Sequence, residues 1–147
     1  MINAKVVPGH RVASGANENP LFPGGTLAMQ APYFRALGLD LTRFHPGTLN
    51  VSITPLRYQV LEPRLTFRQV QWHPTEPAED FSFFDCRIHF NGVICTGLIY
   101  YPHPETKPAH FQATDVLEIL APPIDGLIYG DYIKLDVDPL QMAFVKR

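Results

Sequence analysis

The sharpest pattern of polar residues lies in the segment His45-Pro46-Gly47-Thr48-Leu49-Asn50-Val51. Thr48 and Asn50 stand two residues apart at the expected start of a strand, so their side chains point to the same side of it. Leu49 and Val51 then face the core. A hydroxyl and an amide oxygen are hard ligands, and Mg²⁺ often takes only one or two protein oxygens while phosphates and water supply the rest. The spacing therefore favours a Mg²⁺ site at Thr48 and Asn50, although both residues would also suit a turn in which they cap backbone groups.

A second candidate is a carboxylate inside the apolar run Val116-Leu117-Glu118-Ile119-Leu120-Ala121-Pro122. A charge in apolar surroundings is costly unless it is paired, so Glu118 is a candidate base or ligand-binding group. It can act as a general base only if its carboxylate lies within about 3 Å of the accepting hydroxyl. The alternatives are that Glu118 lies on the solvent face of a strand or pairs with an arginine.

The histidines and aromatic residues give weaker signals. None of the six histidines shows the spacing of metal ligands. His45, His73 and His103 each precede a proline, which is typical of turns. Ser14 lies in no Gly-x-Ser-x-Gly elbow, so no hydrolase triad is indicated. Four aromatic side chains are expected to pack in a barrel core rather than to form a surface on which a ligand ring stacks: Trp72, Phe81, Phe83 and Phe84.

The elements that must position these residues are mostly strands. One short helix is expected with Pro32 at its first position and Gly38 just past its end, and with an apolar face of Tyr33, Phe34 and Leu37. Elsewhere the apolar period is two, which predicts a β-barrel or sandwich of short strands. Within Leu65–Trp72, strict alternation places Leu65 and Phe67 on the face opposite Val70 and Trp72. The expected strands are Lys5–Val7, His10–Ala13, Thr48–Ile53, Tyr58–Leu61, Leu65–Trp72, Phe83–Phe90, Val93–Tyr101, Val116–Leu120 and Tyr132–Val137, with a loop over Ser14–Gly25.

The pair Asn91-Gly92 is the strongest short hairpin signal in the chain. A two-residue loop there pairs Phe90 with Val93, and it pairs Cys86 with Gly97. Cys86 and Cys95 then become diagonal neighbours about 7–8 Å apart, beyond the Cα separation of about 6.8 Å that a disulfide usually needs. Two free thiols in a reducing compartment are therefore expected.

Composition excludes several classes of protein. The 147 residues, 46% hydrophobic and 18% charged, fit one globular domain over residues 1–147. The 15 prolines favour strands joined by stiff turns over long helices. A net charge of −2 gives no basic footprint for nucleic acid. The longest apolar stretch, Val93–Tyr101, is far shorter than the roughly 20 residues of a membrane span, and no signal peptide is evident. We expect a cytoplasmic monomer with small-molecule ligands and neither nucleic-acid nor membrane partners.

The charges are unevenly spread along the chain. Residues 1–72 carry a net charge of +4 and residues 73–147 a net charge of −6. A folded chain with one basic and one acidic side would suit a small anionic ligand. The alternative is that the two halves interleave in one barrel, so that the asymmetry disappears.

The ordered set of motifs resembles the archaeal CTP-dependent riboflavin kinases over nearly the whole chain. That family carries a Gly-Thr-Leu-Asn strand after a short helix, then an Ile-Glu-Ile-Ile-Ala-Pro-like segment and an Asp-Gly-Asp-x-Ile-Lys-like strand. Gly-Thr-Leu-Asn alone is a weak signal, but the ordered set is fairly specific. The matching segments here are Ser14-Gly15, Tyr33–Gly38, His45–Val51, Gly97–Pro102, Leu117–Pro122 and Tyr129–Lys134.

The resemblance implies a compact, mainly β, six-stranded cradle-loop barrel with one short helix. It implies transfer of the γ-phosphate of CTP to riboflavin, giving FMN and CDP, with Mg²⁺ held by Thr48 and Asn50. Glu118 would be the catalytic group at the ribityl or phosphate end of the flavin, and Thr114 would be a second flavin-binding residue. The residues matched to nucleotide binding are Ser14, Gly15, Ala16, Asn17, Pro123 and Ile124.

Both segments expected at the nucleotide depart from the family's pattern. Residues Ala16–Thr26 replace a Gly-x-Gly-x-Gly-Arg-Tyr-like run and include the acidic Glu18. Pro123–Gly126 is shorter than its counterpart and acidic rather than basic. These departures leave open a barrel that binds a flavin or a small phosphorylated ligand without using a nucleotide. A third possibility is a β-barrel that contacts another protein through its proline-rich loops.

Overall fold

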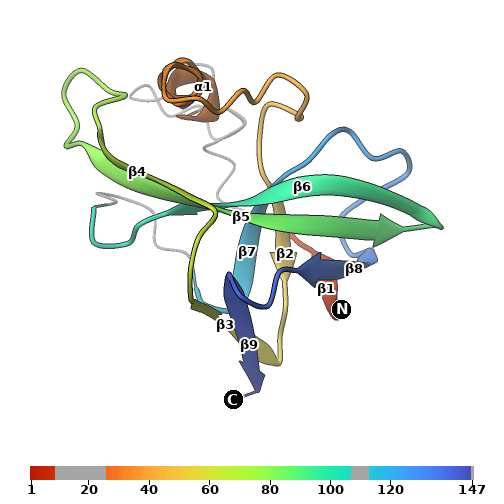
Figure 1. Cartoon of the computed structure of the whole chain (residues 1–147). Coiled ribbons are helices and arrows are strands. Elements are labelled where there is room, and N and C mark those ends of the chain that lie inside the picture. The colour runs from red at the N-terminus through yellow and green to blue at the C-terminus, as the bar shows by residue number, and fades with distance from the viewer. Residues whose placement is uncertain (9–25, 107–112, 147) are drawn as a thin grey trace.

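The computed structural model describes residues 1–8, 26–106 and 113–146, which form mainly strands (Figure 1). The expected strand at His10–Ala13 and the loop at Ser14–Gly25 lie outside them. The elements are β1 (Ile2–Val6), α1 (Thr26–Ala36), β2 (Leu49–Ser52), β3 (Leu56–Val60), β4 (Leu65–Val70), β5 (Glu79–Phe90), β6 (Val93–Pro102), β7 (Val116–Leu120), β8 (Tyr132–Val137) and β9 (Met142–Lys146).

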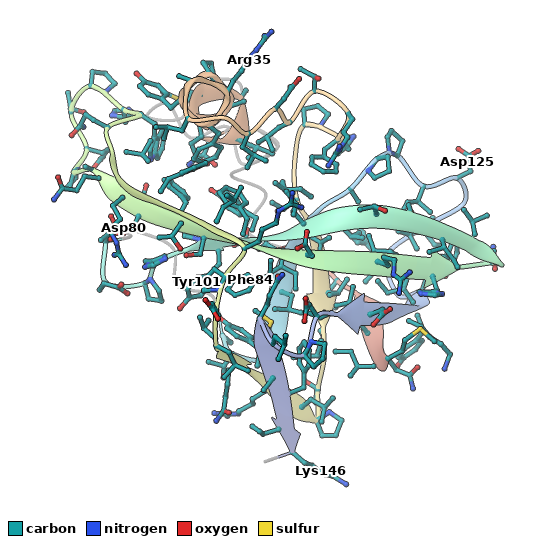
Figure 2. All side chains as sticks on the ribbon, in the orientation of Figure 1. Arg35, Asp80, Phe84, Tyr101, Asp125 and Lys146 are labelled. Atoms are coloured by element: carbon teal, nitrogen blue, oxygen red, sulfur yellow. The ribbon has the colours of Figure 1, made fainter. Side chains whose placement is uncertain are left out.

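Six of the strands close into an antiparallel barrel in the order β5-β6-β7-β2-β1-β8, with β8 pairing back onto β5. The long strand β5 makes closure possible, because its first half pairs with β4 and its second half pairs with β8. Alternate residues of each strand point inward. Phe84, fully buried, meets the ring of Tyr101 at 6.1 Å (Figure 2). The predicted six-stranded β-barrel with one short helix is confirmed.

A second apolar core lies on the other face of β5 and β6, beneath α1. Phe34 of α1 is fully buried there and meets Phe81 and Phe83 edge-on, at ring distances of 5.0 and 5.3 Å. Trp72, Phe81 and Phe83 belong to this core, and Phe84 belongs to the barrel interior. All four aromatic residues that the sequence assigned to a core are thus buried, but three of them cover the outside of the barrel.

The helix begins earlier than predicted. α1 starts at Thr26, so Pro32 lies inside it rather than at its first position. Pro32 costs the helix one backbone hydrogen bond, and burial of Leu27 and Phe34 against the second core offsets this. Tyr33 and Leu37, predicted on the apolar face, are exposed. No helix of the described residues is long and apolar enough to cross a membrane.

The end of α1 is as predicted. Gly38 has a φ of 103°, which glycine adopts without strain. The Leu39 N–H donates to the Phe34 carbonyl oxygen over 2.8 Å, and the Gly38 N–H donates to the Arg35 carbonyl oxygen over 3.1 Å. This pair of bonds is a Schellman motif. It turns the chain sharply towards the Leu41–Pro46 segment that leads into β2.

Strand β4 departs from simple alternation at a bulge. The register with β5 shifts between Phe67 and Val70, and Gln69 has a φ of 54°. One extra residue in a strand reverses the faces of everything after it. Val70 and Trp72 therefore pack in the same core as Leu65 and Phe67, and the prediction that placed them on opposite faces is wrong.

The hairpin at Asn91-Gly92 has the predicted register. Phe90 pairs with Val93 and Cys86 pairs with Gly97. Both cysteines are free, as predicted. Burial raises the pKa of the Cys86 thiol to about 12, and burial also raises the pKa of Cys95, which is only half-buried.

We expect iodoacetamide to modify Cys95 before Cys86 in the native protein at pH 8. The thiolate is the reactive form, and the buried Cys86 holds its proton more strongly and is shielded from reagent. Peptide mass spectrometry over a time course gives both rates, and labelling in urea is the control in which the two thiols should react alike. Equal rates in the native protein would contradict this packing of Cys86.

Gly97 occupies a crowded place between β6 and β7. A Cβ atom on Gly97 would lie 2.7 Å from the backbone oxygen of Leu120. We expect Gly97→Ala to lower the free energy of unfolding by about 1–3 kcal/mol, because backbone must shift to admit the methyl group. Thr96→Ala, at the exposed neighbouring position, is the matched control and should cost less than about 1 kcal/mol. Urea denaturation measures the free energy of unfolding of both variants. Equally small losses would show that β7 shifts to admit the methyl group at little cost.

The charged halves of the sequence interleave across the sheet. Arg64 pairs with Asp85 over 2.8 Å and Arg68 with Asp80 over 3.1 Å. In each pair the cation comes from the basic half and the anion from the acidic half. The alternative in which the barrel removes the asymmetry is therefore favoured.

Candidate functional site

Two of the predicted polar residues, Asn50 and Glu118, form a row with Tyr100 across three neighbouring strands. Asn50 of β2 pairs in register with Glu118 of β7, and Glu118 pairs with Tyr100 of β6. Their chain neighbours Val51 and Ile119 are fully buried in the barrel interior. Because side chains alternate along a strand, Asn50, Glu118 and Tyr100 all lie on the outer face of the barrel.

Thr48 lies next to this row and joins Asn50 and Glu118 into one hydrogen-bonded cluster. Its Oγ1 donates to Glu118 Oε1 over 3.4 Å. Asn50 Nδ2 donates to Thr48 Oγ1 and to the Thr48 carbonyl oxygen, each over 3.3 Å. The prediction that Thr48 and Asn50 share one side of the strand is confirmed. Residues 70 positions apart in the sequence thus place a hydroxyl, an amide and a carboxylate at one point.

The surroundings of the cluster favour neutral tyrosines. Tyr100 is buried and its hydroxyl donates to Gln30 Oε1 over 2.6 Å. Burial raises the pKa of Tyr100 well above its usual value, and the carboxylates of Glu118 and Glu79 add to the effect. Burial, with smaller contributions from Tyr101 and Glu118, raises the pKa of Tyr58 to about 12. Both phenols therefore remain protonated at neutral pH.

A pocket of about 330 Å³ opens beside Thr48 and Asn50. The start of the motif is tied to the end of β7, because the His45 N–H donates to the Ala121 carbonyl oxygen over 2.8 Å. On the other side, the Val7 N–H donates to the Asn50 carbonyl oxygen over 2.9 Å. The lining residues are Val7, His45, Gly47, Thr48, Leu49, Asn50, Ile119, Ala121, Pro122, Pro123, Ile124, Leu127 and Tyr129. We call this the polar pocket.

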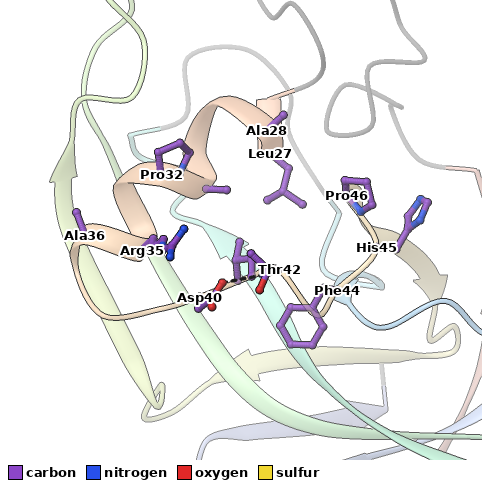
Figure 3. Close-up of a pocket in the computed structure, with 12 residues that line it drawn as sticks. Leu27, Ala28, Pro32, Arg35, Ala36, Asp40, Thr42, Phe44, His45 and Pro46 are labelled. Atoms are coloured by element: carbon purple, nitrogen blue, oxygen red, sulfur yellow. Dashed lines mark hydrogen bonds between the residues drawn. The ribbon is translucent and has the colours of Figure 1, made fainter.

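A larger apolar pocket of about 680 Å³ lies between α1 and residues 40–46 (Figure 3). Small side chains on α1, Ala28 and Ala31, leave the space open. Arg35 and Asp40, both exposed, also line this pocket. The Thr42 N–H donates to Asp40 Oδ1 over 2.9 Å, and this bond, with Arg35 as a smaller contribution, lowers the pKa of Asp40. His45 lines both pockets, so the two meet at the start of the motif.

The structure brings together five of the predicted site residues. Thr48, Asn50, Pro123 and Ile124 line the polar pocket, and Glu118 contacts Thr48. Thr114, the predicted flavin residue, is exposed in the turn before β7 and lines neither pocket; its carbonyl oxygen accepts from the Tyr58 N–H over 3.0 Å. Four predicted nucleotide-binding residues lie outside the described residues: Ser14, Gly15, Ala16 and Asn17.

Sequence reasoning missed the apolar pocket and the part of His45 in it. The sequence did contain a signal, because Ala28 and Ala31 lie three residues apart and therefore on the same face of a helix. Two small side chains on one face leave space beside the helix. Starting the helix at Pro32 removed both alanines from consideration.

Comparison with protein-family models gives no match, and no curated protein matches the sequence.

Proposed function

We propose that this protein transfers the γ-phosphate of a nucleoside triphosphate, with CTP as the expected donor, to riboflavin, forming FMN. The observation that carries the proposal is the meeting of Thr48, Asn50 and Glu118 beside a pocket that Pro123 and Ile124 also line. These are the positions that the resemblance to the riboflavin kinases assigns to metal, catalysis and nucleotide.

The donor set fits a magnesium ion. Thr48 offers a hydroxyl oxygen and Asn50 an amide oxygen, and Mg²⁺ prefers such hard ligands. A half-turn of the Asn50 amide exchanges its nitrogen and oxygen and places Oδ1 about where Nδ2 now faces Thr48 Oγ1, at 3.3 Å. Two oxygens that face each other favour a cation between them, and the nearby Glu118 adds negative charge. When bound, Mg²⁺ would neutralise the charge of the β- and γ-phosphates.

The residues of the cluster would then divide the work of the transfer. Thr48 and Asn50 would fix the position of the triphosphate, since phosphoryl transfer depends mostly on positioning and charge neutralisation. Glu118 would accept the proton of the ribityl 5′-hydroxyl as its oxygen forms a bond to the γ-phosphorus. The bond from the γ-phosphorus to the bridging oxygen breaks, and the nucleoside diphosphate leaves with that electron pair.

The apolar pocket is suited to the ring system of the acceptor. Its volume of about 680 Å³ lies within the range of small-molecule sites, and its walls are largely aliphatic and aromatic. Since His45 lines this pocket and the polar pocket alike, a ring in the first could extend a hydroxylated chain into the second.

One observation favours a second candidate function, a barrel that binds a flavin or phosphorylated ligand without using a nucleotide. None of the described residues that line the polar pocket is a lysine or an arginine. Polyphosphates are usually held by cationic side chains or by clusters of backbone N–H groups. Asp125, beside Ile124, adds an acidic group instead.

The two candidates differ in a direct assay. We expect FMN to form when the protein is incubated with riboflavin, Mg²⁺ and one of CTP, ATP, GTP or UTP, and chromatography resolves FMN from riboflavin. EDTA should stop the reaction. Folded protein that quenches riboflavin fluorescence, but forms no FMN and gives no calorimetric signal with any nucleotide, would support the binding barrel. Folded protein that neither binds riboflavin nor forms FMN would overturn both the kinase and the flavin-binding barrel.

A further inference from the structure

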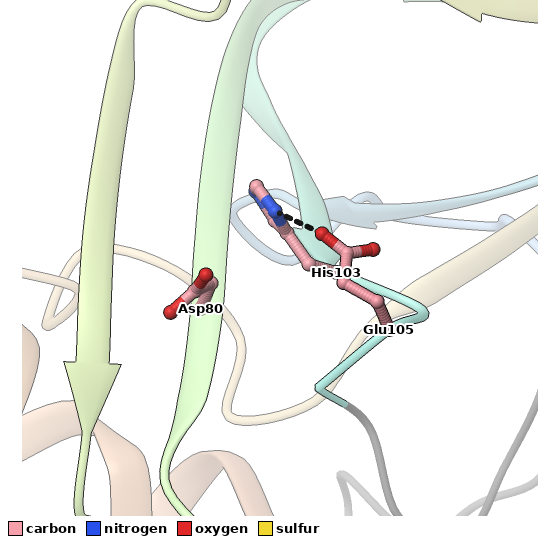
Figure 4. A group of neighbouring side chains, drawn as sticks. All are labelled: Asp80, His103 and Glu105. Atoms are coloured by element: carbon pink, nitrogen blue, oxygen red, sulfur yellow. Dashed lines mark hydrogen bonds and ion pairs between the residues drawn. The ribbon is translucent and has the colours of Figure 1, made fainter.

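We propose that Asp80, His103 and Glu105 form a second metal site, which binds a divalent transition metal such as Zn²⁺. Each of the three residues offers one ligand atom, and these atoms lie within 4.8 Å of one another. Asp80 comes from β5, and His103 and Glu105 follow β6 (Figure 4). Imidazole nitrogen with carboxylate oxygens is a donor set typical of zinc.

The backbone around the three residues is firmly connected. The His103 N–H donates to the Asp80 carbonyl oxygen over 2.9 Å. The Thr106 hydroxyl accepts from the Asp80 N–H over 2.9 Å and donates to the His103 carbonyl oxygen over 3.1 Å. The turn that carries Glu105 is therefore fixed to the strand that carries Asp80, and both sit beside His103.

The imidazole of His103 is held in one orientation through its second ring nitrogen, Nε2. Its Nε2 lies 2.7 Å from the hydroxyl of Ser82, which is fully buried. That hydroxyl lies 2.8 Å from Thr66 Oγ1. When Nε2 donates to Ser82, the lone pair of Nδ1 points towards Glu105 Oε1, at 3.1 Å. Ligating histidines usually donate their second N–H in this way, which fixes the tautomer and the ring.

The net charge of the described groups at the cluster is negative, which favours the binding of a dication. Asp80 and Glu105 are two carboxylates. Among the described residues, the cation that pairs with them is Arg68, whose Nη1 lies 3.1 Å from Asp80 Oδ2. The other carboxylate oxygen of Asp80 accepts the Gln69 N–H over 2.8 Å, which fixes the carboxylate in place. The side chains of Asp80 and His103 are 13% and 14% exposed, whereas those of Arg68 and Glu105 are 69% and 68% exposed. Arg68 can therefore swing away and Glu105 can close onto a metal ion.

The second site is separate from the polar pocket. Asp80 and Asp125, which follows the pocket residue Ile124, lie at opposite sides of the molecule (Figure 2). Three protein ligands leave a coordination position for water or a further ligand. The sequence alone favoured a turn at His103-Pro104, because a histidine before a proline is typical of turns. Spacing could not show that Asp80, from a strand more than 20 residues earlier, lies beside it.

Calorimetric titration of the metal-free protein with Zn²⁺ tests the site. We expect binding at one site, and we expect His103→Ala and Glu105→Gln each to weaken it by at least about tenfold. Arg68→Ala should leave the affinity equal or raise it, since it removes a competing cation from Asp80. Circular dichroism shows whether each variant is folded, and Co²⁺ in place of Zn²⁺ should give a visible absorption band that His103→Ala abolishes.

Two controls address other sources of binding. Glu62→Gln removes an exposed carboxylate elsewhere, and Cys95→Ala removes the more accessible thiol; both should retain full affinity. Folded wild-type protein that binds no Zn²⁺ would overturn the proposal. So would Zn²⁺ binding that His103→Ala and Glu105→Gln leave unchanged, or that Cys95→Ala abolishes.

Discussion

Thr48→Ala combined with Asn50→Ala should reduce FMN formation by at least about 10²–10³-fold, the loss seen when one preorganised group is removed from a reacting charge. The two substitutions remove the hydroxyl and the amide that stand 3.3 Å apart beside the polar pocket. Without them, the segment His45–Val51 offers no side-chain oxygen to a cation near the triphosphate. The loss should appear in kcat at saturating Mg²⁺, because the pocket walls at Pro123 and Ile124 remain.

This double variant should keep its fold. The residues that anchor β2 are Leu49, which packs against the barrel core, and the fully buried Val51. Both point to the opposite face and are unchanged. A melting temperature within a few degrees of the wild-type value would show that the loss of activity is chemical. Full activity of the folded double variant would exclude the metal site at Thr48 and Asn50.

Glu118→Gln is the matched comparison at the same cluster. It keeps the shape of the side chain and removes its ability to take a proton, so kcat should fall by about 10²–10⁴-fold. The affinity for nucleotide, measured by calorimetry, should stay close to the wild-type value. A loss of nucleotide affinity without a loss of kcat would place Glu118 in ligand binding instead of proton transfer.

The strands around the site could be predicted because their signals are local. The register of β5 and β6 followed from Asn91-Gly92, since a two-residue turn fixes every pair along a hairpin. The bounds of β7 and β8 matched the apolar runs at Val116–Leu120 and Tyr132–Val137. Thr48 and Asn50 shared a side because the period of a strand is two.

The missed features depend on contacts between distant segments. β9 has a weak pattern of its own, and it forms because β3 offers a partner along Leu56–Val60. The bulge at Gln69 depends on Asp80, whose carboxylate accepts the Gln69 N–H. The early start of α1 depends on an apolar surface beneath Leu27 that exists only after β5 and β6 have paired.

The meeting of Glu118 with Thr48 was beyond the reach of pattern reasoning from the residues. Each residue was a weak candidate on its own, and only the antiparallel pairing of β2 with β7 makes Asn50 and Glu118 neighbours. The resemblance to a family supplied the connection that spacing could not. The resemblance also assigned Thr114 to flavin binding, and the structure places this exposed residue outside both pockets.

Phe34→Ala should lower the free energy of unfolding by about 3–5 kcal/mol, the usual cost of removing a large buried aromatic side chain. Phe34 is fully buried. Its ring stacks on Phe67 at 5.9 Å and meets Phe81 and Phe83 edge-on, so its loss leaves a cavity between α1 and the sheet. At about 2–4 °C for each kcal/mol, the melting temperature should fall by roughly 10 °C.

Tyr33→Ala provides the matched control for this prediction. Tyr33 is the next residue of the same helix and 44% of its surface is exposed, so its removal should cost less than about 1 kcal/mol. In both variants an alanine replaces an aromatic residue of α1, so the change in helix propensity is about the same in the two. Urea denaturation with a common m-value measures the difference, and equal costs would show that α1 is not anchored through Phe34.

Phe34→Ala also tests whether the attachment of α1 to the sheet affects binding in the apolar pocket. α1 supplies Leu27, Ala28 and Ala31 to the wall of that pocket, and Phe34 is the side chain that fixes α1 onto the sheet. At a temperature where Phe34→Ala remains folded, we therefore expect the KM for riboflavin to rise, because a loosened helix must be ordered again when the acceptor binds. The KM for the nucleotide should change little, since β2 and residues 121–129 line the polar pocket without α1. A rise in both KM values would mean that the two pockets move as one unit through His45.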